Sequence, residues 1–149
     1  MTKSKPLKIL IVEDEPLLAM DVEMMVEDAG HVVVAEAASL FDVEELDAEV
    51  APDIAFVDMH LAKGTNGLDV SALIQERWKA AIIIFVTANP AMIPPDFAGA
   101  HGVIPKPFSR NGFMSAINYI VEGITAPPPM SLKPGDFVAA ERLTAGFAV

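Results

Sequence analysis

The sequence predicts an α/β domain built as a doubly wound, five-stranded parallel sheet. Strand-like and helix-like segments alternate five times along the chain. The strand-like segments are apolar nearly throughout, rather than at every second residue, as expected of strands that are covered on both faces. The 149 residues, 52% of them hydrophobic, also suit one domain with a sizeable core.

The first two strands and helices show clear boundary signals. Leu7–Val12 is an apolar strand, and Pro16 stands where a helix could begin. Apolar residues then recur at helical spacing as far as Gly30, a residue that commonly ends helices. Val32–Ala35 is the second strand, and Ser39 can cap a second helix whose outer face is acidic.

The other three strands and two further helices follow the same order. Ile54–Val57 is the third strand, and the helix after it extends to Trp78. Ile82–Val86 is the fourth strand, apolar and mostly β-branched. Gly102–Pro105 is a short fifth strand, and Ser109 can cap the last helix.

The segment after the fourth strand departs from this regularity. Pro90, Pro94 and Pro95 crowd residues 89–99. Proline removes a helical hydrogen bond and clashes with the preceding turn, so we expect the fourth helix to be short or broken.

A change of composition after Ile124 predicts the domain boundary. Pro127–Pro129 and Pro134-Gly135 are typical of a linker, and Asp136–Leu143 could form a short helix. We therefore expect residues 1–125 to form the domain and residues 126–149 a Pro-containing C-terminal extension, which is too short for a second domain.

Composition excludes several classes of function. Ten basic residues against twenty-one acidic ones give a net charge of -11, which disfavours nucleic acid and anionic membrane surfaces. The absence of cysteine excludes disulfides and thiol catalysis and fits a cytoplasmic protein. No apolar run is long enough to cross a bilayer, and the three histidines lack the spacing of zinc ligands.

Polar side chains follow the strands at their carboxyl ends. Glu13 and Asp14 follow the first strand, Asp58 the third, Thr87 the fourth and Lys106 the fifth. In the strand order 2-1-3-4-5 the first and third strands are neighbours, so the three carboxylates should converge. Like charges this close need compensation, and Mg²⁺, which prefers oxygen ligands, would supply it.

This cluster also suits phosphate chemistry. Asp58 could act as a nucleophile on phosphorus, while the metal and Lys106 stabilise the charge. The hydroxyl of Thr87 could donate to a phosphate oxygen.

Four fragments carry a resemblance to a known family. They are LKILIVEDE, IAFVDMHL, IIFVTA and GVIPKPF, each at a strand end and in the expected order. The sequence between residues 7 and 124 resembles the response-regulator receiver domain of two-component signalling, which implies a flavodoxin-like fold.

The resemblance implies a role for each site residue. Asp58 would be phosphorylated, Asp14 would bind Mg²⁺ directly and Glu13 nearby or through water, and the backbone carbonyl of His60 would complete the protein ligands. The phosphoryl-binding and switch positions would be Thr87, Ala88 and Lys106, and the bond between Lys106 and Pro107 would be cis.

The resemblance also implies partners. A histidine kinase or a histidine phosphotransfer protein would supply the phosphoryl group, with the first helix as docking element, and a protein of unknown identity would receive the signal. The chain would be a monomer or weak homodimer. It would not be an enzyme beyond phosphorylation and hydrolysis at its own aspartate.

Other functions remain open at this point. Val103 stands where the family often has an aromatic switch residue, so the usual output route is in question. The chain could instead be a phosphate sink or relay, or a pseudo-receiver that binds a partner without phosphorylation. A metal-dependent phosphatase is disfavoured because His60, rather than a second carboxylate, lies two residues after Asp58.

Overall fold

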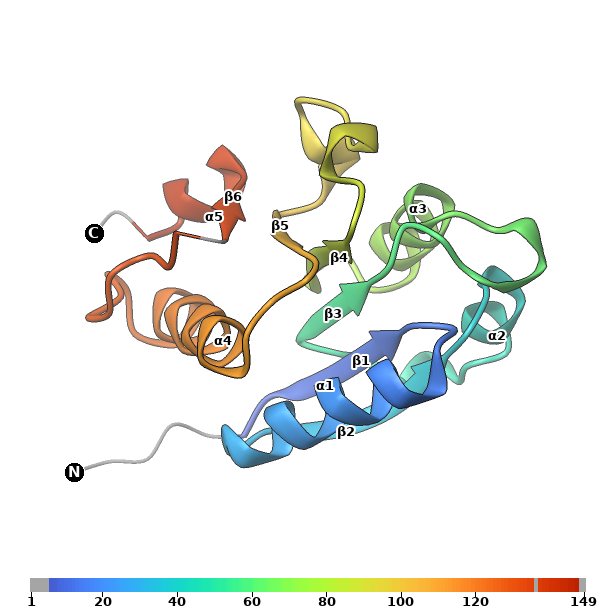
Figure 1. Ribbon diagram of the computed structural model, residues 1–149, viewed down its shortest axis with the longest axis horizontal. Helices are drawn as coiled ribbons and strands as arrows, with labels where there is room; N and C mark the ends of the chain where they lie inside the picture. The colour runs from blue at the N-terminus through green and yellow to red at the C-terminus, as the bar shows by residue number, and fades with distance from the viewer. Residues whose placement is uncertain (1–5, 136, 148–149) are drawn as a thin grey trace.

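The computed structural model describes residues 6–135 and 137–147, which form a six-stranded sheet with helices on both faces (Figure 1). The strand order is β2-β1-β3-β4-β5-β6. The first five strands are parallel, so the predicted order 2-1-3-4-5 is confirmed. The sixth strand is antiparallel to β5 and was not predicted.

The elements have the following bounds. The strands are β1 (Lys8–Val12), β2 (Val32–Ala37), β3 (Ile54–Val57), β4 (Ile82–Thr87), β5 (Gly102–Pro105) and β6 (Val138–Ala139). The α-helices are α1 (Pro16–Asp28), α2 (Leu40–Glu44), α3 (Gly67–Arg77), α4 (Arg110–Thr125) and α5 (Glu141–Ala145). Short 3-10 turns are η1 (Ala48–Val50), η2 (Ala62–Gly64), η3 (Pro90–Met92) and η4 (Phe97–Gly99).

The helix boundaries follow from local chemistry. Pro16 occupies the first turn of α1, where its missing N–H costs nothing, and Gly30 follows the helix with a φ of 93°. Ser39 and Ser109 cap α2 and α4, because each side-chain oxygen accepts the backbone N–H three residues further on. Both predicted serine caps are confirmed.

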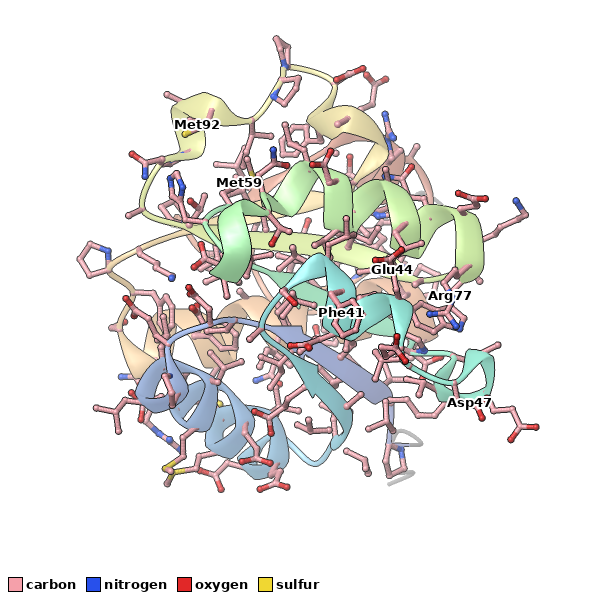
Figure 2. The ribbon with its side chains drawn as sticks, turned by 90° about the vertical axis from the view of Figure 1, so that its right-hand side faces the viewer. Phe41, Glu44, Asp47, Met59, Arg77 and Met92 are labelled. Atoms are coloured by element: carbon pink, nitrogen blue, oxygen red, sulfur yellow. The ribbon has the colours of Figure 1, made fainter. Side chains whose placement is uncertain are left out.

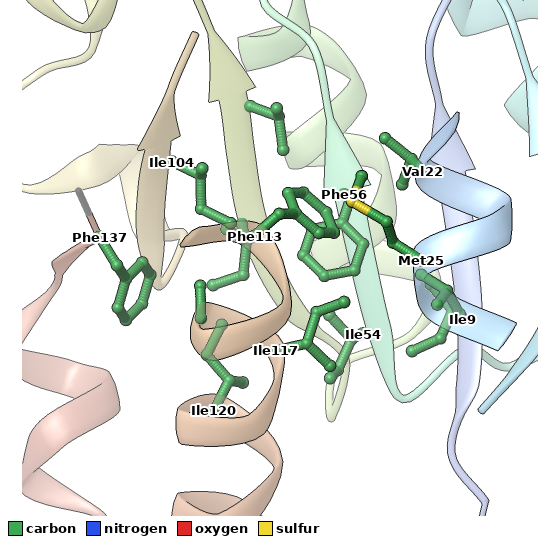
Figure 3. Close-up of a cluster of buried hydrophobic side chains, with 14 of the residues drawn as sticks. Ile9, Val22, Met25, Ile54, Phe56, Ile104, Phe113, Ile117, Ile120 and Phe137 are labelled. Atoms are coloured by element: carbon green, nitrogen blue, oxygen red, sulfur yellow. The ribbon is translucent and has the colours of Figure 1, made fainter. Parts of the chain in front are cut away.

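The core has two layers, one on each face of the sheet. Helices α1 and α4 cover one face, and α2 and α3 cover the other. Along β1, Ile9 and Ile11 point to the first layer, whereas Leu10 and Val12 point to the second. Figure 3 shows the first layer, where Phe56 of β3 meets Phe113 of α4. Strands β1, β3, β4 and β5 are therefore buried on both faces, which explains why they are almost entirely apolar, whereas β2 at the sheet edge is only partly buried.

One arginine joins the two helices of the second layer. The Arg77 guanidinium, at the end of α3, donates to the carbonyl oxygens of Val43 and Leu46 at 2.7 and 2.6 Å. It also lies 4.7 Å from the centre of the Trp78 ring. Figure 2 shows Arg77 beside Glu44 of α2. This contact supplies partners for carbonyl groups at and just beyond the end of a five-residue helix.

The connection from β4 to β5 contains the two turns η3 and η4 in place of an α-helix. Phe97 and Ala98 have φ angles of 59° and 50°, in the left-handed region that non-glycine residues rarely adopt. The Gln75 side chain of α3 donates to the Ala98 carbonyl at 3.0 Å and holds this conformation. The prediction that the helix between the fourth and fifth strands is short or broken is confirmed.

The extension after α4 differs in part from its prediction. Asp136 lies outside the described residues, and the expected helix over Asp136–Leu143 is found only at Glu141–Ala145. Val138–Ala139 instead forms β6, because the outer edge of β5 offers backbone groups that can pair. In the described part of the chain, no helix is both long and apolar enough to cross a membrane.

Candidate functional site

Three carboxylates meet at the carboxyl ends of β1 and β3. Val12 of β1 pairs with Val57 of β3, so the residues that follow these two positions emerge side by side. Ligand oxygens of Glu13, Asp14 and Asp58 lie within 4.8 Å of one another. The predicted convergence of these side chains is thus present in the structure.

A lysine reaches this cluster from the end of β5. The Lys106 Nζ atom lies 3.0 Å from Glu13 Oε1 and 3.2 Å from Asp58 Oδ2. The backbone N–H of Lys106 donates to the Thr87 carbonyl at 2.8 Å, which fixes the start of the loop on the end of β4. The next peptide bond, between Lys106 and Pro107, is cis.

Burial separates the three carboxylates. Glu13 and Asp58 are 8% and 7% exposed, whereas Asp14 is exposed to solvent. Burial raises the pKa of Glu13 to about 7, although the Glu15 amide and Lys106 stabilise its charged form. Burial alone would lower the pKa of Lys106, but its bonds and charge interactions with the two carboxylates outweigh burial and raise it.

The charge balance of this site suits a divalent cation. Three carboxylates face one ammonium group, and two of them are buried. All the side-chain donors are oxygen atoms, which hard cations such as Mg²⁺ prefer. Glu13, Asp14 and Asp58 would hold such an ion, and it would relieve their mutual repulsion.

The remaining predicted residues surround this centre. Thr87 is fully buried, and its hydroxyl accepts the N–H of Asn89 at 3.0 Å. Ala88 is exposed just after β4. The N–H of His60 points back to Asp58 Oδ1 at 3.4 Å. The structure therefore brings Lys106 into contact with Glu13 and Asp58, while the Thr87 hydroxyl is bonded within its own loop.

Asn89 is a site neighbour that the sequence did not reveal. Its side-chain nitrogen lies 3.0 Å from Nε2 of His60, so it joins the loop after β4 to the loop after β3. Its position two residues after Thr87 is visible in the sequence. The partner across the site is not, because it depends on how two loops meet in space.

Gly67, the first residue of α3, is a second such neighbour. A Cβ atom at this position would clash with the backbone carbonyl oxygen of Asp58, and the Gly67 N–H donates to Met59 at 2.9 Å. Only glycine allows α3 to start this close to the strand end that carries Asp58.

The fold and the site together define a doubly wound α/β domain with a carboxylate–lysine centre at the strand ends. The sequence profile of the response regulator receiver domain matches residues 9–118. The chain therefore belongs to the response regulator receiver family of two-component signalling.

Similar proteins agree with this family. The phyllosphere-induced regulator PhyR of Methylorubrum extorquens is 38% identical over 84 residues, which cover 56% of this chain and 31% of PhyR. The transcriptional regulatory protein PdtaR of Mycobacterium tuberculosis is 29% identical over 118 residues, or 78% of this chain and 57% of PdtaR. The chain thus spans less than two thirds of either regulator.

A solved structure shows the same fold. The solution structure of the receiver domain of Erythrobacter litoralis PhyR has a TM-score of 0.70 at 27% identity. The match covers 83% of this chain and 95% of that domain.

Proposed function

We propose that this receiver domain is a phosphorylation-dependent response regulator in which Asp58 accepts a phosphoryl group in a Mg²⁺-dependent reaction. The donor is a phosphohistidine on a histidine kinase or a phosphotransfer protein, and the signal passes on through protein contacts. The observation that supports this proposal is the Asp58 carboxylate, held 3.2 Å from the Lys106 ammonium group beside two further carboxylates.

The residues of the site divide the chemistry between them. An oxygen of Asp58 attacks phosphorus, the bond from phosphorus to the donor imidazole breaks, and the phosphoryl group stays on Asp58. Lys106 offsets negative charge that develops on the phosphoryl oxygens. A bound Mg²⁺ would supply further positive charge at the same oxygens.

The surface of α1 supports docking of such a donor. Leu17, Met20 and Met24 are 78%, 53% and 52% exposed. Their spacing places them on neighbouring turns of a helix that begins directly after Glu13 and Asp14. An exposed apolar stripe beside the site suits a partner that must bring a phosphohistidine to Asp58.

We expect no turnover of a separate substrate. A phosphatase with Asp58 as nucleophile would need a second acid–base group close by, and His60, rather than a carboxylate, lies two residues later. Incubation with a small phosphoester should release no phosphate beyond the background rate.

Intact-mass measurement after incubation with acetyl phosphate and Mg²⁺ tests the proposal. The wild type should gain one phosphoryl group and Asp58→Asn none, while Asp21→Asn, on the exposed surface of α1, should behave as wild type. No gain with acetyl phosphate or with any candidate kinase would contradict the proposal and favour a module that binds its partner without phosphorylation.

A further inference from the structure

Residues 137–147, here called the tail segment, lie along the outer edge of β5 and on α4 (Figure 1). Val138 and Ala139 pair antiparallel with Val103 and Gly102. The N–H of Ala140 extends this pairing by donating to the His101 carbonyl at 2.8 Å. The tail segment therefore occupies the side of β5 that would otherwise offer free backbone groups.

Three apolar side chains anchor the tail segment. Phe137, Leu143 and Phe147 are only 0%, 3% and 6% exposed. The ring of Tyr119 on α4 meets both phenylalanines edge-on, with ring centres 6.0 and 5.6 Å apart. Figure 3 shows Phe137 at the margin of the first core layer, on the side of Ile104 and Ile120. The segment is thus recognised mainly through its aromatic residues.

Two glycines of the domain shape the sockets for these rings. A Cβ atom on Gly102 would lie 2.7 Å from the Phe137 ring, and one on Gly123 would clash with the Phe147 ring. Gly123 lies inside α4, where glycine is a poor choice for helix stability. Its presence fits a requirement for space at this point of the surface.

The polar hold on the tail segment is slight. β6 has two residues, and α5 has five and no side-chain hydrogen bond at its N-cap. Two side chains add bonds: Arg142 donates to the Asp96 carbonyl at 3.1 Å in an exposed position, and Lys133 donates to the Phe137 carbonyl at 2.7 Å. Short elements with few hydrogen bonds open more readily than the central strands of a sheet.

We infer that the β5 edge, with the sockets at Gly102 and Gly123, is an interaction surface for an antiparallel strand, and that the tail segment is its displaceable intramolecular occupant. The partner that fits is a protein with an extended segment that carries aromatic side chains at the two sockets. Its backbone pairs with β5 for affinity, and its rings fill the sockets for specificity. Phosphorylation of Asp58 is not a premise of this inference.

The connection between α4 and the tail segment favours an occupant from the same chain. Residues 126–136 span from the end of α4 to the first anchor, and Ser131 is bonded to Glu122 of α4 through both its N–H and its hydroxyl. This short, anchored connection gives the tail segment a high effective concentration at its own β5 edge. A partner must outcompete it.

A glycine substitution tests the socket. Gly123→Ala should push Phe147 out of its place while leaving α4 at least as helical. We expect the Ala140 amide to exchange its hydrogen at least tenfold faster than in the wild type. Gly135→Ala is the matched control, because a Cβ atom there meets nothing within 4 Å. Equal exchange in all three proteins would overturn the role of the socket.

A peptide with the sequence of residues 137–147 tests the surface itself. On a ¹⁵N-labelled chain carrying Phe137→Ala and Phe147→Ala, the peptide should bind at least tenfold more tightly than on the wild type and shift the Gly102 and Val103 amides. The same peptide with alanine in place of both phenylalanines should not bind. Failure of the native peptide to bind the doubly substituted chain, or equal binding to both chains, would overturn the inference.

A milder variant keeps this test decisive if the double substitution impairs folding. Ala140→Pro removes one N–H donor at a residue whose φ of -72° suits proline. The peptide should bind this chain with an affinity between those of the other two. If wild-type chains sediment as dimers and the doubly substituted chain as a monomer, the β5 edge binds the tail segment of a second copy. That result would contradict the inference that the tail segment of the same chain occupies it.

Discussion

The three carboxylates of the site differ in exposure, and this difference separates metal binding from stability. Glu13 and Asp58 are buried and bonded to Lys106, so substituting either one disturbs a packed, charged group. Asp14 is exposed at the start of the same loop and can be changed without opening the core.

Asp14→Asn should therefore leave the metal-free protein nearly as stable as the wild type but remove the response to Mg²⁺. Binding to the folded state alone at a hundredfold excess over Kd should raise the Tm of the wild type by roughly 5–10 °C. Thermal unfolding with and without Mg²⁺ measures this shift. Asp21→Asn, an exposed substitution of the same kind on α1, should keep it. A full shift in Asp14→Asn would contradict its role as a ligand.

Gly67→Ala tests the close packing behind Asp58. The added Cβ meets a backbone oxygen, which cannot swing away as a side chain could, so α3 or the strand end must move. We expect a loss of about 1–3 kcal/mol in the free energy of unfolding and slower phosphorylation. Chemical denaturation and intact mass measure the two effects. Gly135→Ala should show neither effect. If Gly67→Ala changes neither stability nor phosphorylation, the backbone at Asp58 can move aside at little cost, contrary to this prediction.

The sequence predicted the site residues that share strand ends, because parallel strands bring their carboxyl ends to one edge. Glu13, Asp58 and Lys106 are of this kind, and they meet in the structure. Asn89 matters because its loop lies against the loop that carries His60, and Gly67 matters because α3 begins against the backbone of Asp58. No pattern of residue types in a single sequence encodes such close contacts.

At the scale of elements, His101 joins β4, β5 and the tail segment. Its Nδ1 accepts the Ile83 N–H at 3.0 Å, and its carbonyl accepts the Ala140 N–H. Only a neutral imidazole can accept in this way. Burial first, and the charge of Arg142 second, lower the pKa of His101 to about 4.

This lowered pKa predicts a loss of stability in acid. Between pH 6.5 and about 4 the unfolded chain takes up a proton at His101 and the folded chain does not, so unfolding is favoured as the pH falls through this window. The urea concentration at the midpoint of unfolding should therefore fall further between pH 7 and pH 4.5 in the wild type than in His101→Gln. Equal losses in the two proteins would contradict the assigned protonation state.

The regular elements were predictable because each carried its own signal. Ile54–Val57 and Gly102–Pro105 have the predicted bounds, and both serine caps lie where their sequence places them. The predicted helix over Asp136–Leu143 is replaced by a two-residue strand at Val138–Ala139 and a five-residue helix at Glu141–Ala145. A strand of two residues is too short to show periodicity in the sequence. It forms only because the outer edge of β5 would otherwise be unpaired.

At the scale of the whole molecule, the segment from β4 to β5 connects the site to the tail segment. At one end, Asn89 is bonded to Thr87 and contacts His60. At the other end, Arg142 of α5 donates to the Asp96 carbonyl. Directly after Asp96 come Phe97 and Ala98, whose left-handed conformation the surrounding contacts must hold in place.

A phosphoryl group on Asp58 should therefore change the mobility of the tail segment. With acetyl phosphate and Mg²⁺, we expect altered hydrogen exchange in residues 89–99 and in residues 138–147, as measured by mass spectrometry of proteolytic fragments. Asp58→Asn under the same conditions should show no change. Altered exchange at residues 89–99 alone would mean that the contact of Arg142 with Asp96 does not couple the two regions.

The two outer strands of the sheet differ greatly in length, and this limits how copies of the molecule can stack. Ordered fibrils and filaments grow edge to edge, so each copy must offer two pairing strands of useful length. In the described part of the chain, β2 has six residues, but β6 on the opposite side has only two. Two copies can therefore pair β2 with β2 across a twofold axis. The resulting dimer has only the two-residue β6 at each outer edge, which is too short to extend the assembly.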